Sequence, residues 1–172
     1  MMRTFVTGGT GFIGGAVVRR LLEAGHEVKA LVRPGADTQQ LDGLPVEQVR
    51  GDLRDPESVR RGMAGCGWVF HVAALYSYWG YRWEDFYQTN VEGTRQALEA
   101  ARDQGAERVV YTSSIAALGI HKDGSPANER THRAAWLIAS ARINAPSSWP
   151  SKWPAILRVK ACRWSSSTPA HR

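Results

Sequence analysis

Apolar runs alternate with amphipathic segments along the first 114 residues. Five apolar runs of six to eight residues predict buried strands over 3–8, 26–33, 46–52, 67–74 and 107–114. Apolar positions at helical spacing predict helices over 12–25, 56–65 and 84–105. This alternation predicts an α/β fold, a doubly wound parallel sheet with helices on both faces. The apolar positions expected on the inner side of the first helix are Ile13, Val17, Val18, Leu21 and Leu22.

Three glycines, Gly8, Gly11 and Gly14, stand at equal spacing between the first strand and the first helix. Missing side chains in such a turn let backbone N–H groups approach a pyrophosphate, and the helix N-terminus adds positive partial charge. We expect Gly8 to allow the tight turn, Gly11 to admit the phosphate and Gly14 to let the helix pack closely. The alternative is a flexible turn, but the flanking strand and helix favour a Rossmann-type dinucleotide site.

The ends of the second and third strands bear on the choice of dinucleotide. An acid at the first position usually accepts from the adenosine ribose, whereas Arg can meet a 2′-phosphate. Arg33 stands there, so it either favours NADP over NAD or is a solvated surface residue. Asp52 could accept from the adenine amino group or oppose the dipole of the next helix. Asp55, directly before Pro56, suits the capping role better, so Asp52 is assigned to the cofactor.

Five stretches carry a family resemblance: "VTGGTGFIGGAVVRRLLEAGHEVKALVRP", "GDLRD", "VFHVAA", "NVEGTRQALEAA" and "RVVYTSSIAALG". Together, over about residues 2–129, they resemble extended short-chain dehydrogenase/reductases. More narrowly, they are similar to the NAD-dependent epimerase/dehydratase family and its dihydroflavonol-reductase-like and hopanoid-associated sugar epimerase subgroup. The resemblance implies NADP or NAD as cofactor and a small hydroxyl, keto or sugar substrate. The cofactor contacts it implies are Gly8, Thr10, Gly11, Phe12, Ile13, Gly14, Arg33, Asp52, Leu53, Val72, Ala73, Ala74 and Thr112.

Catalysis in this family resembles hydride exchange with the nicotinamide. A Ser or Thr hydroxyl holds the substrate oxygen, a Tyr acts as acid and base, and a Lys four residues later lowers the Tyr pKa. Ser114 matches the hydroxyl, and its alternative is a turn-forming role. Asn90 would steady the active-site architecture, or be an ordinary helical polar residue. His71 is expected to be a packed core residue rather than a catalyst.

The Tyr-x-x-x-Lys pair is absent from the sequence. The five tyrosines all precede Ser114, and none has a Lys four positions on. The pair is expected roughly 25 to 40 residues beyond Ser114 in this fold. In that interval Pro146, Pro150 and Pro154 recur at four-residue spacing, which no α-helix tolerates. The activity that the family resemblance implies is therefore expected to be impaired in this chain.

The charge is divided unevenly along the chain. Residues 131–172 hold seven Lys and Arg and no acid, whereas residues 1–130 hold 15 basic and 16 acidic residues. Synonymous codons exist for Arg142–Lys152 that, read two bases on, encode YKRSKFLAEQ, which contains Tyr-x-x-x-Lys. We therefore expect residues 1–130 to form an NAD(P)-binding Rossmann domain, incomplete at its C-terminus. Residues 131–172 are expected to be an out-of-frame, poorly ordered tail rich in Trp, Pro and Ser.

Two other functional classes stay open. The first is a non-enzymatic dinucleotide sensor. The second is a nucleic-acid-binding arm in which Trp149, Trp153 and Trp164 stack on bases, although a solvated tail is favoured and nucleic acid is not the expected partner. Family members often form homodimers through two long helices, and loss of the second makes a homodimer doubtful here.

The remaining features indicate an ordinary cytoplasmic protein. Cys66 and Cys162 are far apart and fit neither a disulfide nor a metal cluster, so no metal site is expected and their role is packing. No apolar run reaches about 18 residues, so no membrane span is expected. The first strand begins at once, so no signal peptide is expected. The aromatic loop over residues 75–83 is expected over the nicotinamide end.

Overall fold

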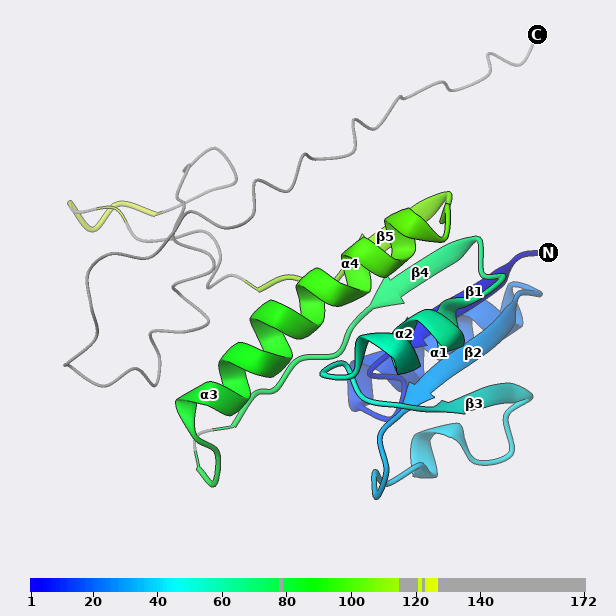
Figure 1. Ribbon diagram of the computed structural model, residues 1–172, viewed down its shortest axis with the longest axis horizontal. Helices are drawn as coiled ribbons and strands as arrows, with labels where there is room; N and C mark the ends of the chain where they lie inside the picture. Colours follow the sequence, from blue (N-terminus) through cyan, green and yellow to red (C-terminus); the bar gives the residue numbers. More distant parts are fainter. Residues whose placement is uncertain (78, 115–120, 122, 127–172) are drawn as a thin grey trace, which may run out of the picture.

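A five-stranded parallel sheet forms the centre of the molecule in the computed structural model, which describes residues 1–77, 79–114, 121 and 123–126 (Figure 1). Its strands are β1 (Arg3–Thr7), β2 (Glu27–Val32), β3 (Val46–Arg50), β4 (Trp68–His71) and β5 (Arg108–Tyr111). Their order is β3-β2-β1-β4-β5, with every neighbouring pair parallel. All carboxyl ends therefore lie at one edge, and the strand order reverses between β1 and β4, where such folds bind ligands.

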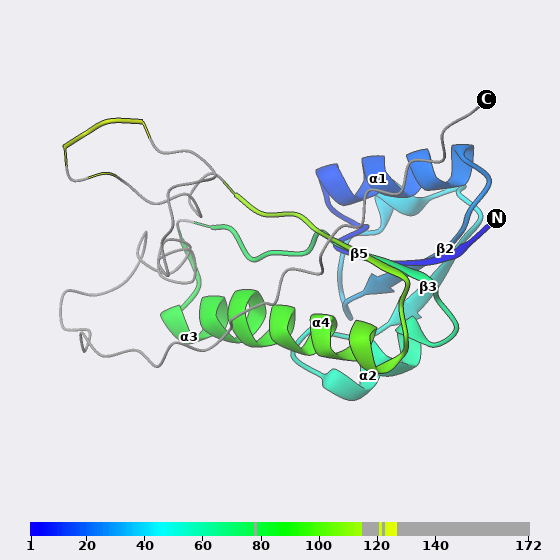
Figure 2. The same cartoon turned by 90° about the horizontal axis from the view of Figure 1, so that it is seen from above.

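Helices cover both faces of this sheet. Figure 2 shows α1 (Phe12–Glu23) on one face and α2 (Pro56–Met63) and α4 (Gly93–Asp103) on the other. A short 3₁₀ turn, η1 (Gln39–Leu41), lies between β2 and β3. Directly before α4 come α3 (Trp83–Phe86) and the π-helical turn η2 (Tyr87–Glu92). This arrangement confirms the predicted doubly wound, Rossmann-type fold.

Two apolar cores lie on opposite faces of the sheet because successive strand residues point in opposite directions. Val6 of β1 packs with Val18 of α1 on one face. Its neighbour Phe5 packs with Met63 of α2 and Ala97 of α4 on the other. Cys66 lies in this second core with 4% exposure, in the packing role predicted for it. Cys162 lies outside the described residues.

Local signals explain where the helices begin and end. The Gly25 backbone has φ +76°, and its N–H donates to the Leu22 carbonyl at 2.9 Å, which ends α1 as predicted. At the start of α2, the Asp55 carboxylate accepts from the Glu57 N–H at 3.1 Å, and Pro56 takes the first helical position. Asp55 is therefore the capping acid, as the sequence indicated.

Three details differ from the sequence prediction. Ile13 was expected on the inner side of α1, but it is 58% exposed because the first helical turn lies beside the glycine turn rather than over the sheet. The fourth and fifth strands are shorter than predicted and end at His71 and Tyr111. The helix predicted over 84–105 contains the π-helical turn η2.

The boundary at residue 130 and the nature of the tail lie outside the described residues. Within the described part of the chain, no helix combines the length and apolar character that crossing a membrane requires.

Candidate cofactor-binding site

The turn between β1 and α1 stands at the reversal point of the sheet. Gly8 has φ +76°, a conformation that residues with a Cβ rarely adopt, and its carbonyl accepts from the Gly11 N–H at 3.0 Å. A Cβ on Gly14 would lie 1.9 Å from the Gly8 oxygen. Gly8 and Gly14 thus have the structural roles that the sequence indicated, which are the tight turn and the close approach of the helix.

The N-terminus of α1 is open to an anion. Its N-cap is Gly11, no side chain of the described residues caps it, and its first turn holds no acid. The first intrahelical bond reaches the Gly15 N–H, so the N–H groups of Phe12, Ile13 and Gly14 have no acceptor within the helix. The side chains of Phe12 and Ile13 are 85% and 58% exposed. These open amides, together with the helix dipole, fit a dinucleotide pyrophosphate.

The segment after β4 forms the neighbouring wall of this site. The Val72 N–H donates to the Thr7 carbonyl at 3.2 Å, and the Ala73 N–H donates to the Thr7 hydroxyl at 3.3 Å. A Cβ on Gly8 would lie 2.7 Å from the Ala73 nitrogen. The glycine turn and Val72–Ala73 are therefore in close contact, and Ala74 follows with its surface exposed.

Charged side chains gather at the ends of β2 and β3. Arg33 follows β2 and is exposed. The Asp52 carboxylate accepts from Arg54 Nε at 3.1 Å and from Arg54 Nη2 at 2.9 Å. Burial raises the pKa of Asp52, but the hydrogen bonds and charge of Arg54 and the charge of Arg33 outweigh it, so this pKa lies below its ordinary value. Arg54 was not predicted as a site residue, although its place two residues after Asp52 was the available signal.

The other predicted contacts divide into two groups. Leu53 is 4% exposed and packs in the core with Val59 and Ala97, so its side chain is not turned to a ligand. Only its main chain remains for the predicted cofactor contact. Thr112 and Ser114 follow β5 at the same carboxyl edge, and both are exposed. Their predicted roles toward cofactor and substrate stay predictions, as do those of Thr10, Arg33 and Asp52.

Asn90 connects the helix before α4 to the segment after β4. Its Oδ1 accepts from the Leu75 N–H at 2.7 Å, and its Nδ2 donates to the Leu75 carbonyl at 2.8 Å. Asn90 lies within η2, and π-helical turns are frequent at functional sites because they shift side chains relative to a regular helix. The predicted steadying role thus has a definite partner, the main chain of Leu75.

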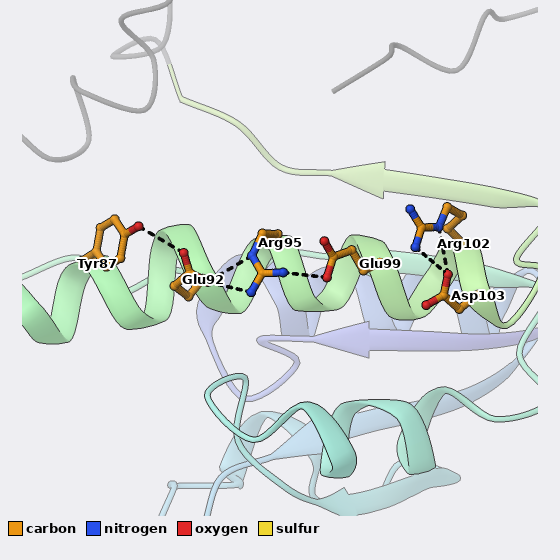
Figure 3. A network of polar contacts seen from close by, with 6 residues as sticks. All are labelled: Tyr87, Glu92, Arg95, Glu99, Arg102 and Asp103. Carbon is orange, nitrogen blue, oxygen red and sulfur yellow. Dashed lines mark hydrogen bonds and ion pairs between the residues drawn. The ribbon is translucent and has the colours of Figure 1, made fainter. Parts of the chain in front are cut away.

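A polar network spans the junction between η2 and α4 (Figure 3). Arg95 donates through Nη2 to Glu92 at 2.8 Å and through Nη1 to Glu99 at 2.7 Å. The Tyr87 hydroxyl donates to the other Glu92 oxygen at 3.1 Å. Glu92 thereby ties the start of the π-helical turn to the regular helix that follows. This network fixes the turn that presents Asn90.

The aromatic loop after Leu75 is largely exposed. Tyr76 is 71%, Trp79 is 84% and Tyr81 is 51% exposed. The loop lies beyond the carboxyl end of β4 and before α3. Its predicted place over the nicotinamide end remains a prediction. Within the described residues, no group of three His, Cys, Asp or Glu side chains is arranged to hold a metal.

The fold and the open helix N-terminus define a protein of the dinucleotide-binding class. The pattern that describes the NAD dependent epimerase/dehydratase family matches residues 4–139. The chain belongs to this family, as the sequence motifs indicated.

Known relatives agree with this assignment. A protein of Synechocystis sp. named as a dihydroflavonol 4-reductase is 50% identical over 125 residues, which are 73% of this chain and 36% of the relative. Sterol demethylase protein B of Methylococcus capsulatus is 43% identical over 124 residues, 72% of this chain and 38% of the relative. UDP-glucose 4-epimerase of Thermus thermophilus, solved in complex with NAD, is 33% identical with a TM-score of 0.66, covering 83% of this chain and 48% of that one. The chain thus spans well under half the length of the two curated relatives.

Proposed function

We propose that this chain is the nucleotide-binding part of an NADP-preferring oxidoreductase or epimerase. The full-length protein would act on a hydroxyl or keto group of a small molecule such as a dihydroflavonol or a nucleotide sugar. The observation that carries the proposal is the uncapped N-terminus of α1 behind the Gly8 turn, with open amides and no acid in the first turn. An anion is the ligand that such an arrangement favours. The names of the relatives support both substrate kinds.

Different residues at the carboxyl edge of the sheet bind different parts of the dinucleotide. The amides of Phe12, Ile13 and Gly14 hold the pyrophosphate, Arg33 contacts the 2′-phosphate, and Asp52 accepts a hydrogen bond from the adenine amino group. Val72, Ala73 and Ala74 line the cofactor from the neighbouring strand end. Bound nicotinamide supplies a hydride donor or acceptor, and Ser114 holds the substrate oxygen.

The same proposal includes impaired catalysis. No tyrosine of the sequence has a lysine four positions later, so the acid and base of the family are missing. The exposure of the β5 side chains favours a sheet that continues beyond β5 in the full-length protein. Val109 is 41%, Val110 is 49% and Tyr111 is 37% exposed, an unusual surface for a parallel strand. We infer that residues 1–130 are the Rossmann domain and that residues 131–172 are read out of frame.

Restoring the reading frame tests this function. The gene is first sequenced across codons 125 to 172, and a second gene then removes two bases at codon 142. Both chains are assayed for NADPH oxidation with a dihydroflavonol and for epimerisation of UDP-glucose. We expect the restored chain to turn over one of these substrates and the present chain to show no turnover above background. Equal rates in both chains would refute the impairment.

A further inference from the structure

A buried histidine outside the proposed chemistry links four elements beneath the glycine turn. His71, at the end of β4, has 0% exposure. Its Nδ1 lies 2.7 Å from the Thr7 hydroxyl of β1, and its Nε2 lies 2.9 Å from the Thr94 hydroxyl of α4. The Tyr111 ring of β5 stacks on the imidazole, with centroids 5.4 Å apart and planes at 20°. The imidazole therefore bridges β1, β4, β5 and α4.

Donors and acceptors can be assigned consistently along this chain of hydrogen bonds. The Thr7 oxygen accepts from the Ala73 N–H, so its single proton is available for His71 Nδ1. In the tautomer that uses this proton, Nδ1 is the acceptor, and the ring proton lies on Nε2 and is donated to Thr94. Burial raises the pKa of Tyr111, and a hydrogen bond with Thr94 opposes that rise, so Thr94 also has Tyr111 as a partner. Burial also lowers the pKa of His71 to about 4, which keeps the ring neutral as this assignment requires.

The near end of the chain lies directly under the cofactor turn. Thr7 precedes Gly8, and Ala73 is the residue against which Gly8 packs most tightly. The Thr7 hydroxyl therefore accepts a hydrogen bond from Ala73 in one wall of the proposed site. The main chain of Thr7 continues into Gly8, which belongs to the other wall. An apolar side chain at Thr7 or Thr94 would leave a ring nitrogen without its partner in a buried place.

We propose that His71 is a positioning residue for the dinucleotide. The chain from Ala73 through Thr7 and His71 to Thr94 fixes the Gly8 turn against Val72–Ala73, so that the phosphate-binding amides are arranged before the ligand arrives. The role in cofactor affinity rests on the proposed function. The alignment of Gly8 and Ala73 does not rest on the proposed function, because it is present in the chain without a ligand.

Matched variants of the full chain separate positioning from general stability. Thr7→Val and Thr94→Val remove one hydroxyl each, and Thr7→Ser and Thr94→Ser keep it. Thr4→Val is the control, because the Thr4 hydroxyl of β1 also donates a hydrogen bond, partly buried, to the Glu27 carbonyl at 2.9 Å on the other side of the strand. NADPH affinity is measured by fluorescence titration and stability by urea unfolding.

We expect both Val variants to weaken NADPH binding about fivefold, the effect of one hydrogen bond. The Ser variants should bind NADPH within about twofold of the unmutated chain. Thr4→Val should do the same, even if its stability falls as much as that of Thr7→Val or Thr94→Val. Val variants that bind as tightly as Thr4→Val, or Ser variants that fail to restore affinity, would overturn the proposal.

Two measurements on the ligand-free chain decide the matter even if NADPH does not bind. In ¹⁵N NMR spectra, the His71 signal, assigned by its loss in His71→Gln, should show the proton on Nε2. Amide exchange at Ala73 should be at least about tenfold faster in Thr7→Val than in Thr4→Val. A proton on Nδ1, or unchanged exchange at Ala73, would contradict the chain. Absence of NADPH binding with these two results intact would instead contradict the proposed function.

Discussion

Asn90 holds both main-chain polar groups of Leu75, accepting from the N–H at 2.7 Å and donating to the carbonyl at 2.8 Å. Because β4 ends at His71, Leu75 lies beyond the strand. The Asn90 side chain takes the place of a neighbouring strand as its hydrogen-bond partner. The two bonds hold the path of the chain from β4 toward the exposed aromatic loop.

Asn90→Ala removes both bonds. Because the N–H and carbonyl of Leu75 are partly buried, we expect the free energy of unfolding to fall by about 1–3 kcal/mol. Urea unfolding measures the change. Gln88→Ala, at an exposed position of the same π-helical turn, is the control and should stay within about 0.5 kcal/mol. A loss no larger than that of the control would show that Leu75 is held by other contacts.

The buried His71 predicts a pH dependence of stability. Its pKa is about 4 in the folded chain and 6.5 ordinarily, so between these values the unfolded chain binds the extra proton. The contribution is full above pH 6.5 and is lost as pH falls toward 4, by about 3 kcal/mol at most. Urea unfolding from pH 7 to pH 4 should therefore show a shallower decline for His71→Gln than for the parent chain. Parallel curves would mean that folding does not lower the pKa of His71.

Arg33 predicts a preference for the phosphorylated dinucleotide. Arg33→Asp replaces a cation with an acceptor for ribose hydroxyls, so we expect NADPH to bind about tenfold more weakly and NADH to bind more tightly. Fluorescence titration with both dinucleotides gives the ratio. Arg20→Asp, an equal change of charge in the last turn of α1, should leave both affinities within about twofold. An unchanged ratio in Arg33→Asp would make Arg33 a solvated surface residue.

Gly14→Ala tests the contact between α1 and the turn. A Cβ there would meet the Gly8 oxygen at 1.9 Å, and this neighbour is main chain that cannot move aside. We expect a loss of about 3 kcal/mol in the free energy of unfolding, measured in urea. Ala16→Ser, at an exposed position of α1, is the control and should change stability by less than about 0.5 kcal/mol. A Gly14→Ala chain of parent stability would show that the helix does not approach the turn so closely.

Much of the fold could be predicted because apolar runs, helical spacing and helix-capping residues are local signals. The strands, the end of α1 at Gly25 and the cap at Asp55 were all identified in this way. The fourth strand was predicted too long because Val72 and Ala73 continue its apolar run, although β4 ends at His71 and their main chain contacts Gly8. The π-helical turn could not be predicted, since apolar spacing does not reveal a shift in the helical hydrogen bonds.

The site was predictable where chemistry is concentrated in a short motif. The glycine turn is of this kind, because three glycines at two equal spacings along the chain define it. The partners of His71 are not, since Thr7 is 64 residues away and Thr94 is 23 residues away. His71 was expected as a core residue, and its burial agrees with that expectation. Its hydrogen bonds arise only when β1, β4 and α4 come together.

Calorimetric titration of the parent chain and of Gly11→Ala with NADPH and NADH tests the account most directly. A Cβ on Gly11 would meet only the Gly8 oxygen, at 3.4 Å, so the variant should fold with a loss of at most about 1 kcal/mol. The same Cβ would stand where the phosphates approach the open amides. The account predicts saturable binding by the parent chain and at least about tenfold weaker binding by Gly11→Ala. No saturable heat from the parent chain with either dinucleotide, or equal affinity in the two chains, would contradict it.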